Sequence, residues 1–366
     1  MTDSKPVLHR LQGIANGMMA IESRTLFVEG YNERTLLALY EITGDRAYLD
    51  HVRKWVRKLL DLQKPEGYWS TGYGDVYFAD TGSALGLFLN FYKFATPEER
   101  KRIDQALQRY FDLLLLKGDT AGKPFVHEDG SLGCGFGTDA KGTIVGSLNQ
   151  PYTISTALTG AEIFAAWHYL KGHDRDKQTA VKACNWILAA MAGDPPPVPQ
   201  AKPGQIPYLF GDANNPVYAF HAAEPELLDR LWKTWPYDTS TYAGEGFIAA
   251  WTYIDDQGFR QSLGRRVKPH VQWLLRTQNE DGSWGRKRSD DQLRSHGVVN
   301  LLVWYYGRVE QDPRVATAIG RYCDLLIDEP RSRYLLSNPI GIALVGRALA
   351  TILKPGVDCN RWLDHH

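Results

Sequence analysis

The feature that most constrains this chain is a regular alternation of two kinds of predicted helix along its whole length. One kind is small and apolar and follows a loop rich in Tyr, Asn and Asp. Because polar residues are sparse after its first turn, this kind should be buried on most sides. The pattern predicts six such helices, over residues 32–43, 80–94, 152–170, 240–254, 294–306 and 339–353.

The second kind of helix is amphipathic and carries Lys, Arg and Glu on one face. It is predicted at about 7–23, 46–63, 97–116, 176–191, 259–278 and 313–327. Glycine and aspartate stand between helices, as in Thr43-Gly44-Asp45, which is usual where one helix ends and the next begins.

Six apolar helices alternating with six amphipathic ones predict an all-α (α/α)6 toroid with an inner and an outer ring. An open stack of helix pairs is the structural alternative. The count of six, and the absence of a repeat with a polar outer face at either end, favour the closed ring. We expect one domain over residues 1–366 and no sheet larger than a short hairpin.

Two long segments interrupt the alternation. Residues 118–149 are rich in Gly, and residues 193–236 are rich in Pro and include a short helix-like stretch. Loops of this length in a compact domain are usually functional or disordered. Both lead into apolar helices, so we expect them over one face of the ring, as walls of a cleft.

Charge and cysteine content exclude several classes of protein. Lys plus Arg and Asp plus Glu both number 42, which argues against a nucleic-acid-binding protein. No stretch approaches the ~20 apolar residues of a membrane span. Four cysteines without CxxC spacing argue against a disulfide framework or a zinc knuckle, and we expect neither metal nor cofactor.

The N-terminus lacks the pattern of a signal peptide, so we expect a cytoplasmic protein. A periplasmic or secreted protein whose leader has been removed would look the same. The oligomeric state stays open.

A Q-x-x-x-G-x-W pattern occurs twice, from Gln63 to Trp69 and from Gln278 to Trp284. We interpret it first as a clamp at the end of an outer helix, in which Gly supplies a positive-φ turn and Trp packs back on the ring. The pattern resembles the QW repeat of squalene-type terpene cyclases. It also resembles turns in polysaccharide lyases and prenyltransferase β subunits, so it indicates architecture more than chemistry.

A second resemblance concerns the first hundred residues. The run from Leu37 to Asp45, followed by Tyr48-Leu49, resembles the helix–TGD–xxYL connection of unsaturated glucuronyl and rhamnogalacturonyl hydrolases. Asp80, at the start of the second apolar helix, resembles an acid of those enzymes. The resemblance implies a carbohydrate-active enzyme. The third apolar helix departs from it, because Asn149, Gln150 and Tyr152 stand where those hydrolases carry an acid.

Residues at the starts of the apolar helices should meet on one face of a ring, where rigid helices hold them. A glycan-cleaving cleft needs a proton donor, a base or nucleophile, and aromatic platforms. The catalytic candidates are Asp80, Asp238, Glu245, His296 and Tyr152, and the substrate-binding candidates are Tyr77, Gln150, Tyr237, Tyr242, Trp284, Arg288, Arg294 and Asp291.

For hydrolysis, Asp80 and Asp238 would form the acid–base pair, and Glu245 could replace either. For β-elimination, a base such as Tyr152, Tyr242 or His296 would remove a proton while an arginine neutralises a uronate.

Each candidate also has a structural interpretation. Asp80 and Asp238 resemble helix caps. Glu245 lies between glycines inside an apolar helix and either faces a cavity or forms an ion pair within the ring. His296 could be a hydrogen-bonded core residue, and Arg288, in a short basic run, could be solvated surface.

Three functions follow. The first is an enzyme that cleaves glycosidic bonds in an oligo- or polysaccharide containing uronic acid, by hydrolysis or elimination. The second is an isoprenoid cyclase or prenyltransferase, in which Tyr and Trp would stabilise cations, although the D-x-D-D motif of the cyclases is missing. The third is a non-catalytic toroid that binds a glycan or a protein.

Overall fold

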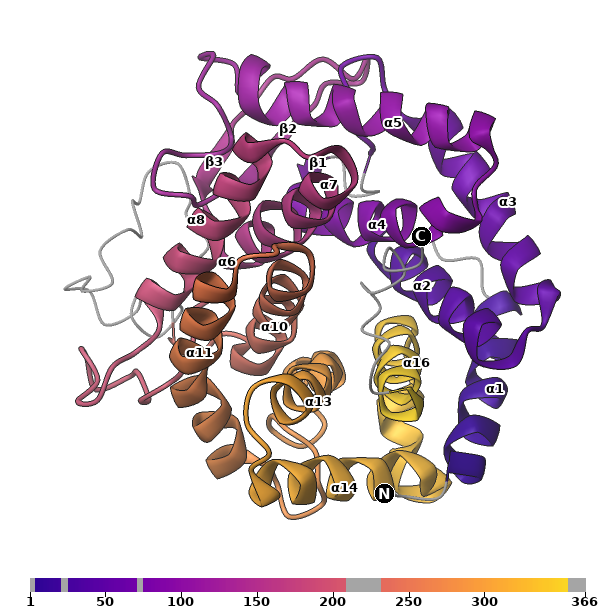
Figure 1. Ribbon diagram of the computed structural model, residues 1–366, viewed down its shortest axis with the longest axis vertical. Coiled ribbons are helices and arrows are strands. Elements are labelled where there is room, and N and C mark those ends of the chain that lie inside the picture. Colours follow the sequence, from indigo (N-terminus) through magenta and orange to yellow (C-terminus); the bar gives the residue numbers. More distant parts are fainter. Residues whose placement is uncertain (1–3, 21–25, 71–74, 209–231, 355–366) are drawn as a thin grey trace.

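The computed structural model describes residues 4–20, 26–70, 75–208 and 232–354. Within these ranges the chain forms a closed ring of helices in two layers (Figure 1). The predicted all-α (α/α)6 toroid is confirmed.

The inner ring holds six helical segments, three of them unbroken and three interrupted or extended by tighter or wider turns. They are α2 (Leu26–Thr43); α4 (Phe78–Phe91) with η1 (Tyr92–Phe94); α6 (Thr153–Ser155), η3 (Thr156–Ile163) and α7 (Phe164–Lys171); α10 (Pro236–Tyr253); α12 (Asp290–Arg294), η4 (Ser295–Gly297) and α13 (Val298–Arg308); and α16 (Pro339–Leu353). Most residues of these helices are buried, as their apolar sequences predict, and the partly exposed ones lie mainly at the helix ends.

The outer ring consists of six amphipathic helices that lie against the inner ring. They are α1 (Ser4–Ala20), α3 (Arg46–Leu62), α5 (Pro97–Asp112) with η2 (Leu113–Lys117), α8 (Asp174–Ala190), α11 (Gln257–Thr277) and α14 (Pro313–Ile327), with α15 (Glu329–Ser332) and η5 (Arg333–Leu336) leading into α16. The N-terminal helix α1 packs on α16 and α14, so the first outer helix closes the ring against the last inner one (Figure 1).

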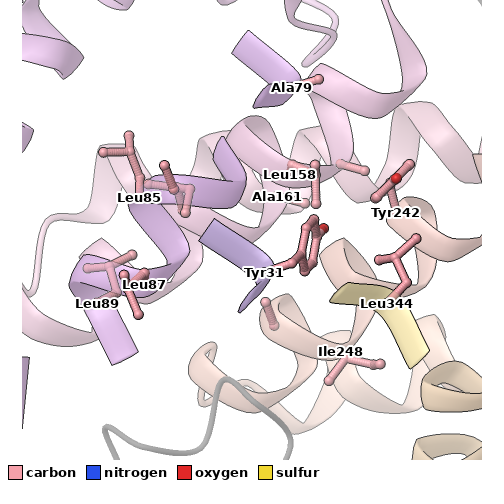
Figure 2. Close-up of a cluster of buried hydrophobic side chains, with 14 of the residues drawn as sticks. Tyr31, Ala79, Leu85, Leu87, Leu89, Leu158, Ala161, Tyr242, Ile248 and Leu344 are labelled. Carbon is pink, nitrogen blue, oxygen red and sulfur yellow. The ribbon is translucent and has the colours of Figure 1, made fainter. Parts of the chain in front are cut away.

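The core of the ring is apolar and continuous between inner helices. Figure 2 shows Leu158 and Ala161 of η3 near Tyr31 of α2, with Tyr242 and Ile248 of α10 close by. All five side chains are at most 5% exposed. Burial of this apolar surface, at about 25 cal/mol per Å², is the main stabilising contribution to the fold.

The first Q-x-x-x-G-x-W segment joins two neighbouring outer helices. The Gln63 side chain donates to the carbonyl oxygens of Gly67, at 3.0 Å, and of Ala106 in α5, at 2.8 Å. The Trp69 indole donates back to the carbonyl of Leu59 in α3 at 2.8 Å. Gly67 has a φ of 107°, and a Cβ there would lie 2.4 Å from a backbone oxygen of α5, so only glycine fits.

The second segment repeats this geometry between α11 and α14. Gln278 donates to the carbonyls of Gly282 and Ala318, both at 2.9 Å, and the Trp284 indole donates to the carbonyl of Leu274 at 2.9 Å. Gly282 has a φ of 94°. The geometry agrees with the helix-end clamp. Trp284 is completely buried in this clamp, so the prediction that it binds substrate at the rim of a cleft is wrong.

The predicted limit of one short hairpin is also wrong. Three short strands, β1 (Asp75–Tyr77), β2 (Gly133–Gly137) and β3 (Leu148–Pro151), form one antiparallel sheet in that order. Val76 pairs with Phe136, and Gly135 pairs with Leu148. The strands are too short and too rich in Gly for a sequence signal, and β1 lies far from β2 in the chain. The sheet attaches the 118–149 loop to the entrances of α4 and α6.

Candidate active site

A cavity of about 320 Å³ lies where several inner helices begin. Its walls come from the first turns of α2, α4, α10 and α16, from the start of the third inner segment, and from the end of α12. The described residues that line it are Phe27, Val28, Tyr77, Ala79, Asp80, Tyr152, Ile154, Tyr208, Trp235, Asp238, Tyr242, Arg294 and Ile340. The structure thus brings together six of the predicted site residues, from four different inner segments.

Two carboxyl groups face this cavity from different helices. Asp80 lies in the first turn of α4 and Asp238 in the first turn of α10. Neither is the capping residue of its helix, because those positions belong to Tyr77 and Trp235. Asp238 is 1% exposed, and neither of its carboxylate oxygens has a hydrogen-bond partner among the described residues. A buried carboxylate without partners is costly, which is typical of a functional group rather than a structural one.

Burial shifts the acidity of both aspartates toward neutrality. It raises the pKa of Asp80 to about 6, against the opposing charge of Arg294. Burial also raises the pKa of Asp238 to about 7; Arg294 opposes this rise, and the negative charges of Asp291 and Asp80 add to it. Two carboxyl groups of different acidity near pH 7 can exchange protons with a bound molecule.

A single guanidinium group belongs to the same cavity. Arg294 Nη1 lies 4.0 Å from Asp238 Oδ2, and the guanidinium sits over the Trp235 ring at 4.8 Å from its centroid. Its side chain is 26% exposed, so it can meet a ligand as well as Asp238. An arginine held in this way suits a carboxylate on the ligand.

Aromatic side chains form much of the remaining wall. The Tyr152 hydroxyl donates to the Tyr208 hydroxyl at 3.1 Å, and the Thr153 hydroxyl donates to the carbonyl of Pro207 at 2.9 Å. Burial raises the pKa of both Tyr152 and Tyr242 well above 10. Residues 207–208 belong to the second long loop, so this part of the loop does border the cavity. Residues 209–231 of that loop lie outside the described residues.

Glu245 does not reach the cavity. One oxygen of its carboxylate lies 2.7 Å from Arg347 Nη1, and the other accepts a hydrogen bond from the Tyr31 hydroxyl at 2.8 Å. Arg34 lies 3.9 Å away and forms a second buried ion pair with Glu162 at 2.5 Å. The prediction that Glu245 faces the cleft is wrong. The competing interpretation, an ion pair within the ring, is the one observed, because arginines of α2 and α16 reach the centre of the ring.

His296 is likewise outside the cavity. It is fully buried, and its ring hydrogen-bonds the hydroxyl of Tyr322 on the outer helix α14. Burial lowers the pKa of this histidine to about 3, so it is neutral and fixed in the core. The expectation that it lines the cavity is wrong.

Four other predicted binding residues do not line the cavity. Gln150 lies in β3, and Tyr237 stacks on Trp273 at 5.0 Å in a separate groove. Arg288 is exposed and does not line the cavity, so its place near the rim stays a prediction. Asp291 accepts backbone hydrogen bonds from the start of α10 instead of lining the wall.

The sequence missed Phe27, Val28, Tyr208, Trp235 and Ile340. Phe27 and Val28 were not predicted as site residues because α2 begins six residues before its predicted start, at Leu26 rather than residue 32. Trp235 directly precedes Pro236, the first residue of α10, and proline at that position is a usable signal. No local sequence pattern identifies Tyr208 or Ile340 as a site residue.

No group of three or more His, Cys, Asp or Glu side chains in the described ranges is arranged to hold a metal ion. No described helix is long and apolar enough to cross a membrane.

No protein-family model and no curated protein matches the chain. Several solved structures do. A family 105 glycoside hydrolase of C. acetobutylicum ATCC 824 has a TM-score of 0.64 and 13% identity, covering 96% of this chain and 99% of that one. An α-1,6-mannanase of Salegentibacter sp. HEL1_6, in complex with α-1,6-mannotriose, has a TM-score of 0.63 and 11% identity, covering 96% and 100%. A polysaccharide lyase has a TM-score of 0.64 and 10% identity, covering 98% and 97%.

These likenesses extend over nearly the whole of both chains, but the identities are low. They show that the chain has the (α/α)6 toroid fold found in glycoside hydrolases and polysaccharide lyases, and at the level of fold they confirm the predicted resemblance to six-hairpin carbohydrate enzymes.

Proposed function

We propose that this protein is a glycoside hydrolase that cleaves an oligo- or polysaccharide containing uronic acid. One observation carries the proposal: Asp80 and Asp238, both with pKa values near neutrality, share an aromatic cavity with Arg294. Most glycoside hydrolases use two carboxyl groups, one to protonate the leaving oxygen and one as base or nucleophile. Its fold, shared with solved carbohydrate-cleaving enzymes, supports the same class of reaction.

Roles can be assigned from the acidity of the pair. Asp238 has the higher pKa, about 7, and so keeps its proton nearer to neutral pH. It is the proposed general acid that donates a proton to the glycosidic oxygen. Asp80, with a pKa of about 6, is the proposed base that takes a proton from the attacking water.

The remaining walls suit a sugar. Tyr77, Tyr152, Tyr208 and Trp235 offer flat apolar faces and hydroxyl groups, which match the faces and hydroxyls of pyranose rings. Arg294 supplies a fixed positive charge beside Asp238, so a uronate carboxylate is the preferred substituent there.

Hydrolysis is better supported than β-elimination. Elimination needs a base that removes a carbon-bound proton, and Tyr152 and Tyr242 were the candidates together with His296. Burial keeps the pKa of both tyrosines well above 10, so they stay protonated at neutral pH. His296 lies in the core against Tyr322. The two aspartates are the better acid and base.

The isoprenoid alternative receives less support from the same cavity. Its aromatic rings would suit a carbocation. However, the guanidinium of Arg294 lies within the cavity walls, and a fixed positive charge opposes a cationic intermediate.

The experiment is an activity screen of the purified protein. Substrates are unsaturated uronides, saturated uronic-acid oligosaccharides and neutral α-1,6-mannooligosaccharides, with new reducing ends and new carbon–carbon double bonds measured separately. We expect reducing ends from the acidic substrates without new double bonds. New double bonds would instead assign the protein to the lyases, and cleavage of none of these glycans would contradict the proposal.

Matched variants connect the activity to the cavity. Asp80→Asn and Asp238→Asn should each lower turnover by ~100-fold or more. Arg294→Gln should raise KM for acidic substrates by ~10-fold or more, in line with the loss of a charge-assisted hydrogen bond. Asp255→Asn is the control, because that carboxylate is 96% exposed in the connection between α10 and α11. Full activity of either cavity asparagine variant would remove that aspartate from the mechanism.

A further inference from the structure

The start of α10, which carries Asp238, is held by a residue of another helix. Asp291, in α12, accepts a hydrogen bond through Oδ1 from the backbone N–H of Tyr237 and another from that of Asp238, both at 3.1 Å. A single carboxylate oxygen therefore bridges two consecutive amide groups that are more than 50 residues away in the chain.

The local sequence cannot supply this contact. The first amide groups of a helix have no partner within the helix and are usually satisfied by a Ser, Thr, Asp or Asn immediately before it. Here that position is Trp235, whose side chain has no acceptor and makes no capping hydrogen bond. Trp235 also has a φ of 41°, a left-handed conformation that is uncommon for a residue other than glycine. The first turn of α10 thus depends on a partner from outside.

We propose that Asp291 is a positioning residue for the reaction, which holds the first turn of α10 so that the Asp238 carboxyl is presented to the cavity. The inference rests on the proposed function, in which Asp238 is the general acid. Asp291 itself does not line the cavity.

Other contacts from α12 and the turn after it also hold the start of α10. The carbonyl of Arg294 accepts a hydrogen bond from the Thr241 hydroxyl, one turn further along α10, at 3.0 Å. The Arg294 guanidinium lies over the ring of Trp235. Gly297, just after α12, lies so close to Thr241 that a Cβ there would come within 2.3 Å of its methyl group. The start of α10 is therefore packed against α12 and η4 along one side.

Asp291 also influences Asp238 through its charge. Its negative charge raises the pKa of Asp238, whereas Arg294, on the same helix as Asp291, lowers it. The remaining groups that act on Asp238 are Asp80 of α4 and Tyr242 of α10. Burial raises the pKa of Asp291 itself to about 6, against its two backbone hydrogen bonds and Arg294.

Two substitutions separate geometry from charge. Asp291→Asn keeps an oxygen that can accept both amide hydrogens and removes the negative charge. Asp291→Ala removes both. If Asp291 positions Asp238, Asp291→Ala should lower kcat by ~10-fold or more with little change in KM, because small displacements of a reacting group are costly. The kcat of Asp291→Asn should be at least tenfold higher than that of Asp291→Ala. The alkaline limb of the pH–rate profile of Asp291→Asn should nevertheless move to lower pH.

A second measurement does not depend on turnover. The pKa of the Asp238 carboxyl is followed by NMR in protein carrying ¹³C-labelled aspartate, with the signal assigned through Asp238→Asn. In Asp291→Asn this pKa should fall by about half a unit or more. Asp290→Asn, a neighbouring exposed position of α12, is the matched control and should leave both the profile and the titration close to those of the unsubstituted protein.

The outcomes distinguish this inference from the proposed function. If the unsubstituted protein cleaves no glycan but the Asp238 pKa falls in Asp291→Asn, the function is wrong and the coupling stands. If kcat survives in Asp291→Ala, the positioning role is overturned. An unchanged Asp238 pKa in Asp291→Asn overturns the electrostatic part.

Discussion

Arg347 of α16 and Glu245 of α10 meet at 2.7 Å in the centre of the ring, behind the cavity wall. Both side chains are almost fully buried, at 4% and 1% exposed. Tyr31 links this pair to the cavity wall, because its hydroxyl donates to Glu245 while its ring packs against Phe27 and Tyr242, which line the wall. The pair joins the middle of α10 to the middle of α16 within the inner ring.

Removing the charge of Glu245 should therefore affect stability. In Glu245→Gln, Arg347 would lose the carboxylate that lies 2.7 Å from it, and Arg34 would lose the one at 3.9 Å. Breaking a buried ion pair by removing one partner costs about 3–5 kcal/mol, and we expect a loss of at least about 2 kcal/mol in the free energy of unfolding, measured in urea at pH 7. Asp61→Asn, which breaks an exposed pair with Arg102, should cost about 1 kcal/mol or less. A fully stable Glu245→Gln variant that has lost turnover would return Glu245 to the list of catalytic candidates.

The acidity of Asp238 predicts how stability varies with pH. Its pKa is about 7 in the folded protein, above the ordinary value of an unfolded aspartate, so the folded state binds more protons between about pH 4 and 7. This group's contribution to stability is therefore complete below about pH 4 and is lost as the pH rises toward 7. Asp238→Asn should raise the free energy of unfolding by about 1–3 kcal/mol at pH 8 and change it little at pH 4.

Thermal or urea unfolding of both proteins across this pH range checks the prediction. Asp255→Asn, with its exposed carboxylate, should show no such pH-dependent gain. Equal stability of Asp238→Asn and the unsubstituted protein at pH 8 would mean that the carboxylate is not destabilised by burial.

The helix-end clamps should matter for folding and not for the reaction. Gln278→Leu would leave the carbonyls of Gly282 and Ala318 without their side-chain donor. We expect a loss of about 1–3 kcal/mol in the free energy of unfolding, with KM and kcat unchanged, because the clamp lies outside the cavity. Gln261→Leu, at an exposed position of α11, is the control and should cost less than about 0.5 kcal/mol. A large change in KM would contradict the structural interpretation of this motif.

Much of the fold can be predicted from the sequence because it depends on local patterns. The predicted ranges 313–327 and 339–353 coincide with α14 and α16. Predictions failed where polar residues are buried. Asn32, Glu33 and Arg34 form the start of the predicted helix over residues 32–43, yet they lie inside α2, which begins at Leu26, with at most 4% exposure. Arg34 is tolerated there because Glu162, far away in the chain, forms an ion pair with it.

The sequence by itself determined the toroid and the position of Asp80 and Asp238 at or just before the starts of inner helices. Helical periodicity, glycine turns and prolines act over a few residues, so they can be read from one segment at a time. Only the tertiary structure decided which polar groups meet. Glu245 and Asp238 belong to the same helix, yet Glu245 pairs with Arg347 in the centre of the ring. Asp238 lies 4.0 Å from Arg294, and its oxygens accept no hydrogen bond from the described residues. The partners come from other helices, and their distances depend on how all the inner helices pack around one axis.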